Sequence, residues 1–128
     1  MTSILLRFAC LTLLSLSATT LRAEQTSTDA VVLEQVSTIL NIKKDQLLLE
    51  QPFSKQTPPA DELDVVEIVM AIEEALNIEI SDHALGKAVG PKGLENLPKH
   101  LTIKQLQRIV AEVYKSSRPA NKPKPKKS

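Results

Sequence analysis

Hydrophobic positions recur at helical spacing in three segments of this 128-residue chain. The first segment, residues 28 to 41, carries Val32, Leu33, Val36, Ile39 and Leu40. The second, residues 61 to 77, carries Val65, Ile68, Val69, Ile72, Ala75 and Leu76. The third, residues 102 to 115, carries Ile103, Leu106, Ile109, Val110 and Val113. An apolar stripe at this period packs one helix face against its neighbours, so the pattern predicts a small all-α bundle.

The segments between these helices contain the residues that interrupt helices. Residues 43 to 60 include three prolines and few periodic apolar positions, which predicts a long first loop pinned by Leu47, Leu49 and Phe53. All three glycines lie between residues 86 and 93, with prolines alongside. We therefore expect any third helix to be short and to be followed by a mobile connection.

Two residue types mark the ends of the second helix. Asp61 has the short carboxylate side chain that caps helix starts, and Asn77 tolerates the left-handed backbone at a helix end.

The first 23 residues have the composition of a secretory signal peptide. They contain no acid, an apolar run from residue 8 to 16 that is too short to span a bilayer, and a small residue at Ala23. Cleavage near Ala23 would give a periplasmic or secreted chain. The alternative is an organelle transit peptide, because Arg7 and Arg22 accompany several Ser and Thr residues. A lipid anchor on Cys10 is disfavoured, since Arg7 stands where such a motif needs an aliphatic residue.

The charge of the chain is divided between its body and its end. The net charge is +1, but residues 24 to 114 hold fifteen acids and eight bases, whereas residues 115 to 128 hold six bases and no acid. We therefore expect a helical domain over residues 24 to 115 and a disordered basic Pro/Lys tail over residues 116 to 128. The acidic body disfavours nucleic acid as a partner, and the tail favours weak contact with anionic lipid or polymer.

A second apolar patch lies almost opposite the main stripe of the 61 to 76 helix. A helical wheel places Leu63, Val66 and Met70 there, between two rows of carboxylates. Residues 61 to 82 hold eight acids and no base, so the helix lacks the Glu–Lys pairs that a merely solvated face could use. The pattern predicts a docking site, and we name it the acidic face: Asp61, Glu62, Leu63, Asp64, Val66, Glu67, Met70, Glu73 and Glu74. The alternative is that Leu63 and Val66 pack beneath loops while the carboxylates only provide solubility.

The same helix resembles a known family. The segment from residue 61 to 82 is DELDVVEIVMAIEEALNIEISD, which is similar to the second helix of acyl carrier proteins. Further similarities are the Leu-Asn-Ile at residues 40 to 42, the Pro-Phe at residues 52 to 53 and the Leu-Thr-Ile at residues 101 to 103. The resemblance runs from about residue 29 to 114 and implies an acyl-carrier-like four-helix bundle. Two departures are a slightly longer loop before Asp61, with two adjacent prolines, and an expanded segment before the last helix.

The resemblance also implies which residues function. In this family the serine of an Asp-Ser-Leu motif carries a 4′-phosphopantetheine arm, and Glu62 stands at that position here. A carboxylate has no hydroxyl to modify, so no cofactor is expected. Glu62 is then either a favourable first-turn residue or a stand-in for the charge of the missing phosphate. Matching positions in the family engage basic partner enzymes, which implies a protein partner with a basic docking surface for Leu63, Glu67, Met70, Glu73 and Glu74.

Other candidate chemistry is sparse. His83 and His100 lack metal-ligand spacing, and the glycines near Lys87 do not form a phosphate loop. No nucleophile has a plausible base, so we expect no catalytic residues, no metal and no enzyme activity. The sequence favours an exported, unmodified carrier-like domain that binds protein. The alternatives are a carrier modified elsewhere or binding lipid noncovalently, and an envelope-associated structural protein tethered by its tail.

Overall fold

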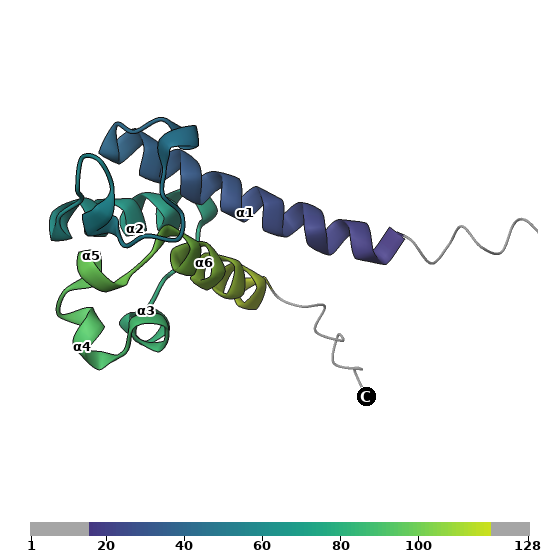
Figure 1. The fold of residues 1–128 in the computed structure, drawn as a ribbon. Coiled ribbons are helices and arrows are strands. Elements are labelled where there is room, and N and C mark those ends of the chain that lie inside the picture. Colours follow the sequence, from purple (N-terminus) through teal and green to yellow (C-terminus); the bar gives the residue numbers. More distant parts are fainter. Residues whose placement is uncertain (1–15, 119–128) are drawn as a thin grey trace, which may run out of the picture.

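The computed structural model describes residues 16 to 118, and all regular structure in that range is helical. The predicted all-α bundle is confirmed. The elements in chain order are α1 (Leu16–Leu40), η1 (Lys44–Gln46), η2 (Phe53–Lys55), α2 (Glu62–Leu76), α3 (Asp82–Val89), α4 (Pro91–Leu94), α5 (Leu97–His100) and α6 (Ile103–Ser117). Figure 1 shows α1 as the longest element, with one end extending beyond the rest of the bundle.

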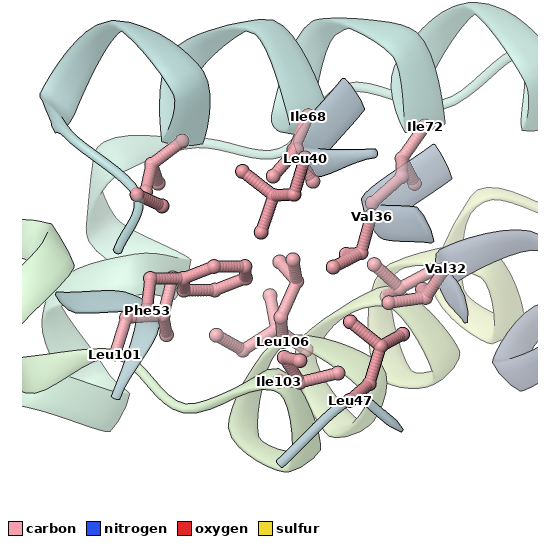
Figure 2. Close-up of a cluster of buried hydrophobic side chains, with 14 of the residues drawn as sticks. Val32, Val36, Leu40, Leu47, Phe53, Ile68, Ile72, Leu101, Ile103 and Leu106 are labelled. Atoms are coloured by element: carbon pink, nitrogen blue, oxygen red, sulfur yellow. The ribbon is translucent and has the colours of Figure 1, made fainter. Parts of the chain in front are cut away.

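Three helices supply most of the core. Helix α1 packs against both α2 and α6, and α5 packs against η2 and α2. Apart from Thr28, the buried residues of these three helices belong to the predicted stripes: Val32, Val36, Leu40, Val65, Ile68, Ile72, Ile103, Leu106, Ile109 and Val110. Figure 2 labels part of this set and shows the side chains of Val36, Leu40, Ile68 and Leu106, among others, converging between the helices. The helical periodicity therefore identified the buried apolar residues of these three helices.

One aromatic ring connects the long first loop to that core. Phe53 is fully buried, and in Figure 2 its ring points toward the centre of the cluster, between Leu40 and Leu106. Its backbone N–H donates to the carbonyl of Leu101 over 3.1 Å. The carbonyl of Phe53 accepts from the N–H of Ala60, also over 3.1 Å. Ala60 is the residue before the N-cap of α2. The ring thus positions the loop relative to both α2 and the start of α6.

A buried amide holds the same loop closed. Gln56 is 3% exposed, and its Oε1 accepts from the N–H of Leu48 at 3.0 Å while its Nε2 donates to the carbonyl of Leu48 at 2.8 Å. The prediction that Leu49 pins the loop is wrong, because that side chain is exposed. Leu49 contributes its carbonyl instead, which accepts from the N–H of Lys104 at 3.0 Å. Hydrogen bonds from the Gln56 side chain to the backbone therefore hold this part of the loop, where an apolar contact of Leu49 was expected.

The first helix begins much earlier than predicted. We expected a start at residue 28 or 29, and α1 begins at Leu16. Residues 16 to 28 contain no proline or glycine and several good helix formers, so nothing in them ends the helix. The proposed signal peptide lies partly outside the described residues, which also exclude the tail from residue 119 onward. Within the described range, no helix combines the length and apolar character needed to cross a bilayer.

The segment before α6 is also more ordered than predicted. Instead of a mobile connection after α3, it forms the two short helices α4 and α5. Pro91 and Pro98 both lie in first turns, where a missing N–H removes no helical hydrogen bond. Gly93 allows α4 to approach α3, since a Cβ at this position would lie 2.6 Å from the Cβ of Val89. Pro91 and Pro98 therefore begin helices, and Gly93 permits close helix packing, although these residue types suggested a loop.

We expect Phe53→Ala to lower the free energy of unfolding by about 3–5 kcal/mol, since it removes a fully buried aromatic ring and leaves a cavity. Leu48→Ala in the same loop is the control. That side chain is 46% exposed, so we expect a change within about 0.5 kcal/mol. Urea unfolding followed by circular dichroism measures both. Equal losses for the two variants would contradict the role assigned to the ring.

Candidate functional site

Helix α2 is buried on one side and exposes large apolar side chains on the other. Val65 and Ile72 are fully buried, whereas Leu63, Val66 and Met70 are 66%, 44% and 61% exposed. The alternative in which Leu63 and Val66 pack beneath loops is therefore wrong. Exposed apolar side chains grouped on one helix face are a common property of interaction surfaces.

The predicted core stripe is slightly too wide. Ala75 was expected to face the core but is exposed, while Val69 and Leu76 are half-buried. On a helical wheel Ala75 lies about 80° from Val65, at the edge of the predicted stripe. The exposed region of α2 is correspondingly broader than the sequence predicted.

The start of α2 is fixed by a reciprocal capping arrangement. Asp61 is the N-cap, as predicted, and its Oδ1 accepts from the N–H of Asp64 at 2.9 Å. The Oδ2 of Asp64 accepts from the N–H of Asp61, also at 2.9 Å. Both carboxylates are thus partly committed to the helix end. Glu62 is the first helical residue, between the two, and is exposed near the positive end of the helix dipole.

The remaining carboxylates of the acidic face differ in their surroundings. Glu67 and Glu74 are exposed, whereas Glu73 is half-buried and its Oε1 accepts from the backbone N–H of Ile80 at 2.7 Å. Glu73 therefore fastens the segment after α2 to the helix, a role that its position on the wheel did not predict. Asn77 ends the helix in the left-handed conformation, with φ 51°, as expected. The freely accessible acids are consequently Glu62, Glu67 and Glu74.

Within residues 16 to 118, no group of three or more His, Cys, Asp and Glu side chains is arranged to hold a metal ion. The two histidines predicted to be surface residues, His83 and His100, are exposed. The exposed side of α2 presents carboxylates and apolar side chains, a combination that suits noncovalent recognition.

No family model matches the chain, and no solved structure matches it. The chain is 47% identical over 60 residues to the acyl carrier protein of Helicobacter acinonychis, a match that covers 47% of this chain and 70% of that protein.

The chain belongs to the acyl carrier protein family.

Two further acyl carrier proteins support the assignment. That of Guillardia theta is 47% identical over 57 residues, covering 41% of this chain and 69% of its own length. That of Buchnera aphidicola is 51% identical over 47 residues, covering 37% of this chain and 58% of the relative. The chain therefore spans less than two thirds of the Buchnera relative, and the family assignment applies to the matched helical region.

We expect the two sides of α2 to respond differently to truncation. Ile72→Ala removes fully buried atoms and should cost about 2–5 kcal/mol of folding stability. Met70→Ala removes atoms that are mostly in water and should change stability by less than about 0.5 kcal/mol. Thermal melts followed by circular dichroism compare the pair. A Met70 variant as unstable as the Ile72 variant would show that the patch is buried packing.

Proposed function

We propose that this chain is an exported acyl-carrier-like domain that carries no phosphopantetheine and binds a protein partner through the acidic face. The observation that carries the proposal is the exposure of Leu63, Val66 and Met70 between carboxylates on a capped, well-packed helix. A rigid helix that presents apolar anchors loses little conformational entropy on binding. The partner would offer an apolar pocket with basic residues around it.

The identity of residue 62 supports the absence of the arm. We infer that Glu62 takes the position of the modified serine, because it lies between Asp61 and Leu63 at the first helical position of α2. Transfer of phosphopantetheine requires a hydroxyl oxygen to attack the pyrophosphate of coenzyme A, and a carboxylate side chain lacks one. The negative charge of Glu62 instead stabilises the helix by about 0.3–1 kcal/mol, because it lies near the positive end of the helix dipole.

Export is proposed from the first 23 residues, and it fits the missing arm. Phosphopantetheine transfer uses coenzyme A, which the family meets in the cytosol or an organelle matrix. An exported chain would have little access to that donor. The side-chain contacts of the bundle include Thr28 and Val32, both buried, and these residues follow the proposed cleavage point. Removal of residues 1 to 23 would therefore leave the buried residues from Thr28 onward in the chain.

We expect the chain to stay unmodified when it is coexpressed with a broad-specificity phosphopantetheinyl transferase. Intact-mass measurement of exported protein should give a chain that begins at Glu24 and carries no added mass. Glu62→Ser is the matched variant, because it supplies the hydroxyl at the same capped position. Phosphopantetheine on the native chain would refute the proposed loss of carrier chemistry, and an unprocessed or lipid-bearing exported chain would refute the assignment of the leader.

We expect the anchors and the charges of the acidic face to act on different rate constants. With a partner captured from the host's envelope fraction, Glu67→Lys with Glu74→Lys should chiefly slow association and weaken its salt dependence. Met70→Ala should chiefly speed dissociation. Surface plasmon resonance separates the two effects.

The matched control for the charge reversal is Asp45→Lys with Glu95→Lys. Both residues are exposed and lie outside α2, so the change in net charge is the same. Capture that is weakened equally by both charge reversals would contradict a specific role for the acidic face.

A further inference from the structure

The described chain from residue 83 onward has the opposite charge to the segment that contains α2. Residues 83 to 118 hold seven bases and two acids, while residues 61 to 82 hold eight acids and no base. The overall acidity of the body conceals this division. Two regions of one molecule with opposite charge can attract each other between copies.

A cleft lies within the basic part. Helix α3 packs against α6, and between them is an open cleft of about 690 Å³. Its less exposed lining is mostly apolar, with Ala84, Ala88 and Ile109, and also includes the half-buried Gln105. Its exposed lining includes Lys87 from α3 and Arg108 from α6. A volume in the range of about 300–1,000 Å³ is sufficient to bury several side chains of a ligand.

The exposed side of α2 has the features that such a cleft would recognise. Leu63, Val66 and Met70 are separated by three and four residues, the spacing of the anchors that an amphipathic helix inserts into a groove. Glu67 and Glu74 are exposed on the same helix and could meet Lys87 and Arg108. The apolar anchors match the apolar lining, and the charges are of opposite sign.

We propose that the cleft between α3 and α6 receives the acidic face of a second copy of this chain. The inference rests on the proposed role of the acidic face in binding a basic partner, and it names one such partner. Each copy offers one acidic face and one cleft, so the contact is heterologous and produces head-to-tail chains or a closed ring. One helix in one cleft is a small interface, so association is weak and increases with concentration.

One acid in the cleft limits how the incoming helix can lie. Glu112 lines the cleft on α6, one turn beyond Arg108, and repels carboxylates of the same sign. The incoming Glu67 and Glu74 are therefore directed toward Lys87 and Arg108 instead. This polarity gives the contact a preferred orientation.

The test is a charge exchange followed by sedimentation velocity on the full chain, from about 10 µM to about 1 mM. Wild-type protein should associate with concentration, and less so at high salt, where charges are screened within a few ångströms. Lys87→Glu with Arg108→Glu reverses the cleft, and Glu67→Lys with Glu74→Lys reverses the helix. Each double variant alone should associate on the order of tenfold more weakly.

Mixing the two double variants should restore association, since each then supplies a surface opposite to one on the other. Lys92→Glu with Lys99→Glu is the matched control: both side chains are exposed and do not line the cleft, and self-association should persist. Circular dichroism checks that every variant is folded. A monomeric wild type, or two variants that do not associate when mixed, would overturn the proposal.

The same variants distinguish this inference from the proposed function. Loss of captured partner in the α2 variant, together with unchanged self-association in the cleft variant, would overturn the cleft contact and leave the proposed function standing. Loss of self-association in both variants, with unchanged capture of the partner in the α2 variant, would support the cleft contact and overturn the proposed function.

Discussion

The burial of Phe53 is the contact on which the presentation of α2 depends. The regular structure in the loop before α2 consists of the two short 3₁₀ helices η1 and η2. Local structure alone therefore cannot set the path of the loop. The ring fixes one point of that path inside the bundle, and the backbone of Phe53 bonds to Leu101 and Ala60 on either side. Asp61 follows Ala60 directly, so the burial of Phe53, eight residues earlier, helps to fix the position at which α2 starts.

Helix α2 combines two demands that usually conflict. Its inner side contributes the fully buried Val65, Ile68 and Ile72 to the core, while its outer side leaves three large apolar side chains exposed. Full burial of each of these side chains would stabilise the fold by about 1.5–3 kcal/mol. The isolated chain lacks this stabilisation because they are exposed. A partner could recover part of that energy without any rearrangement of the core. The helix can therefore evolve its outer surface while its inner surface stays constant.

Local rules predicted α2 best because its determinants lie within it. The cap at Asp61, the left-handed end at Asn77 and the opposed apolar sides all follow from one helix and its period. The functions of Gln56 and Glu73 could not be predicted in this way, since each bonds backbone groups seven or eight residues distant across a turn. The short helix α5 was missed because it packs against η2, a contact between segments far apart in sequence. The basic lining of the α3–α6 cleft was missed because it assembles from two separated helices.

The two hydrogen bonds between Gln56 and Leu48 have a consequence for the dynamics of the loop. They join residues 48 and 56 within the loop through one side chain, so the segment between them cannot fray progressively from one end. Opening requires both bonds to break together, and the adjacent Phe53 ring links further opening to loss of the core. We therefore expect the loop to open as part of the same cooperative unit as the helices, with backbone amides that exchange with solvent at a rate set by that unit. An irregular segment can in this way be as slow to open as the helices it connects.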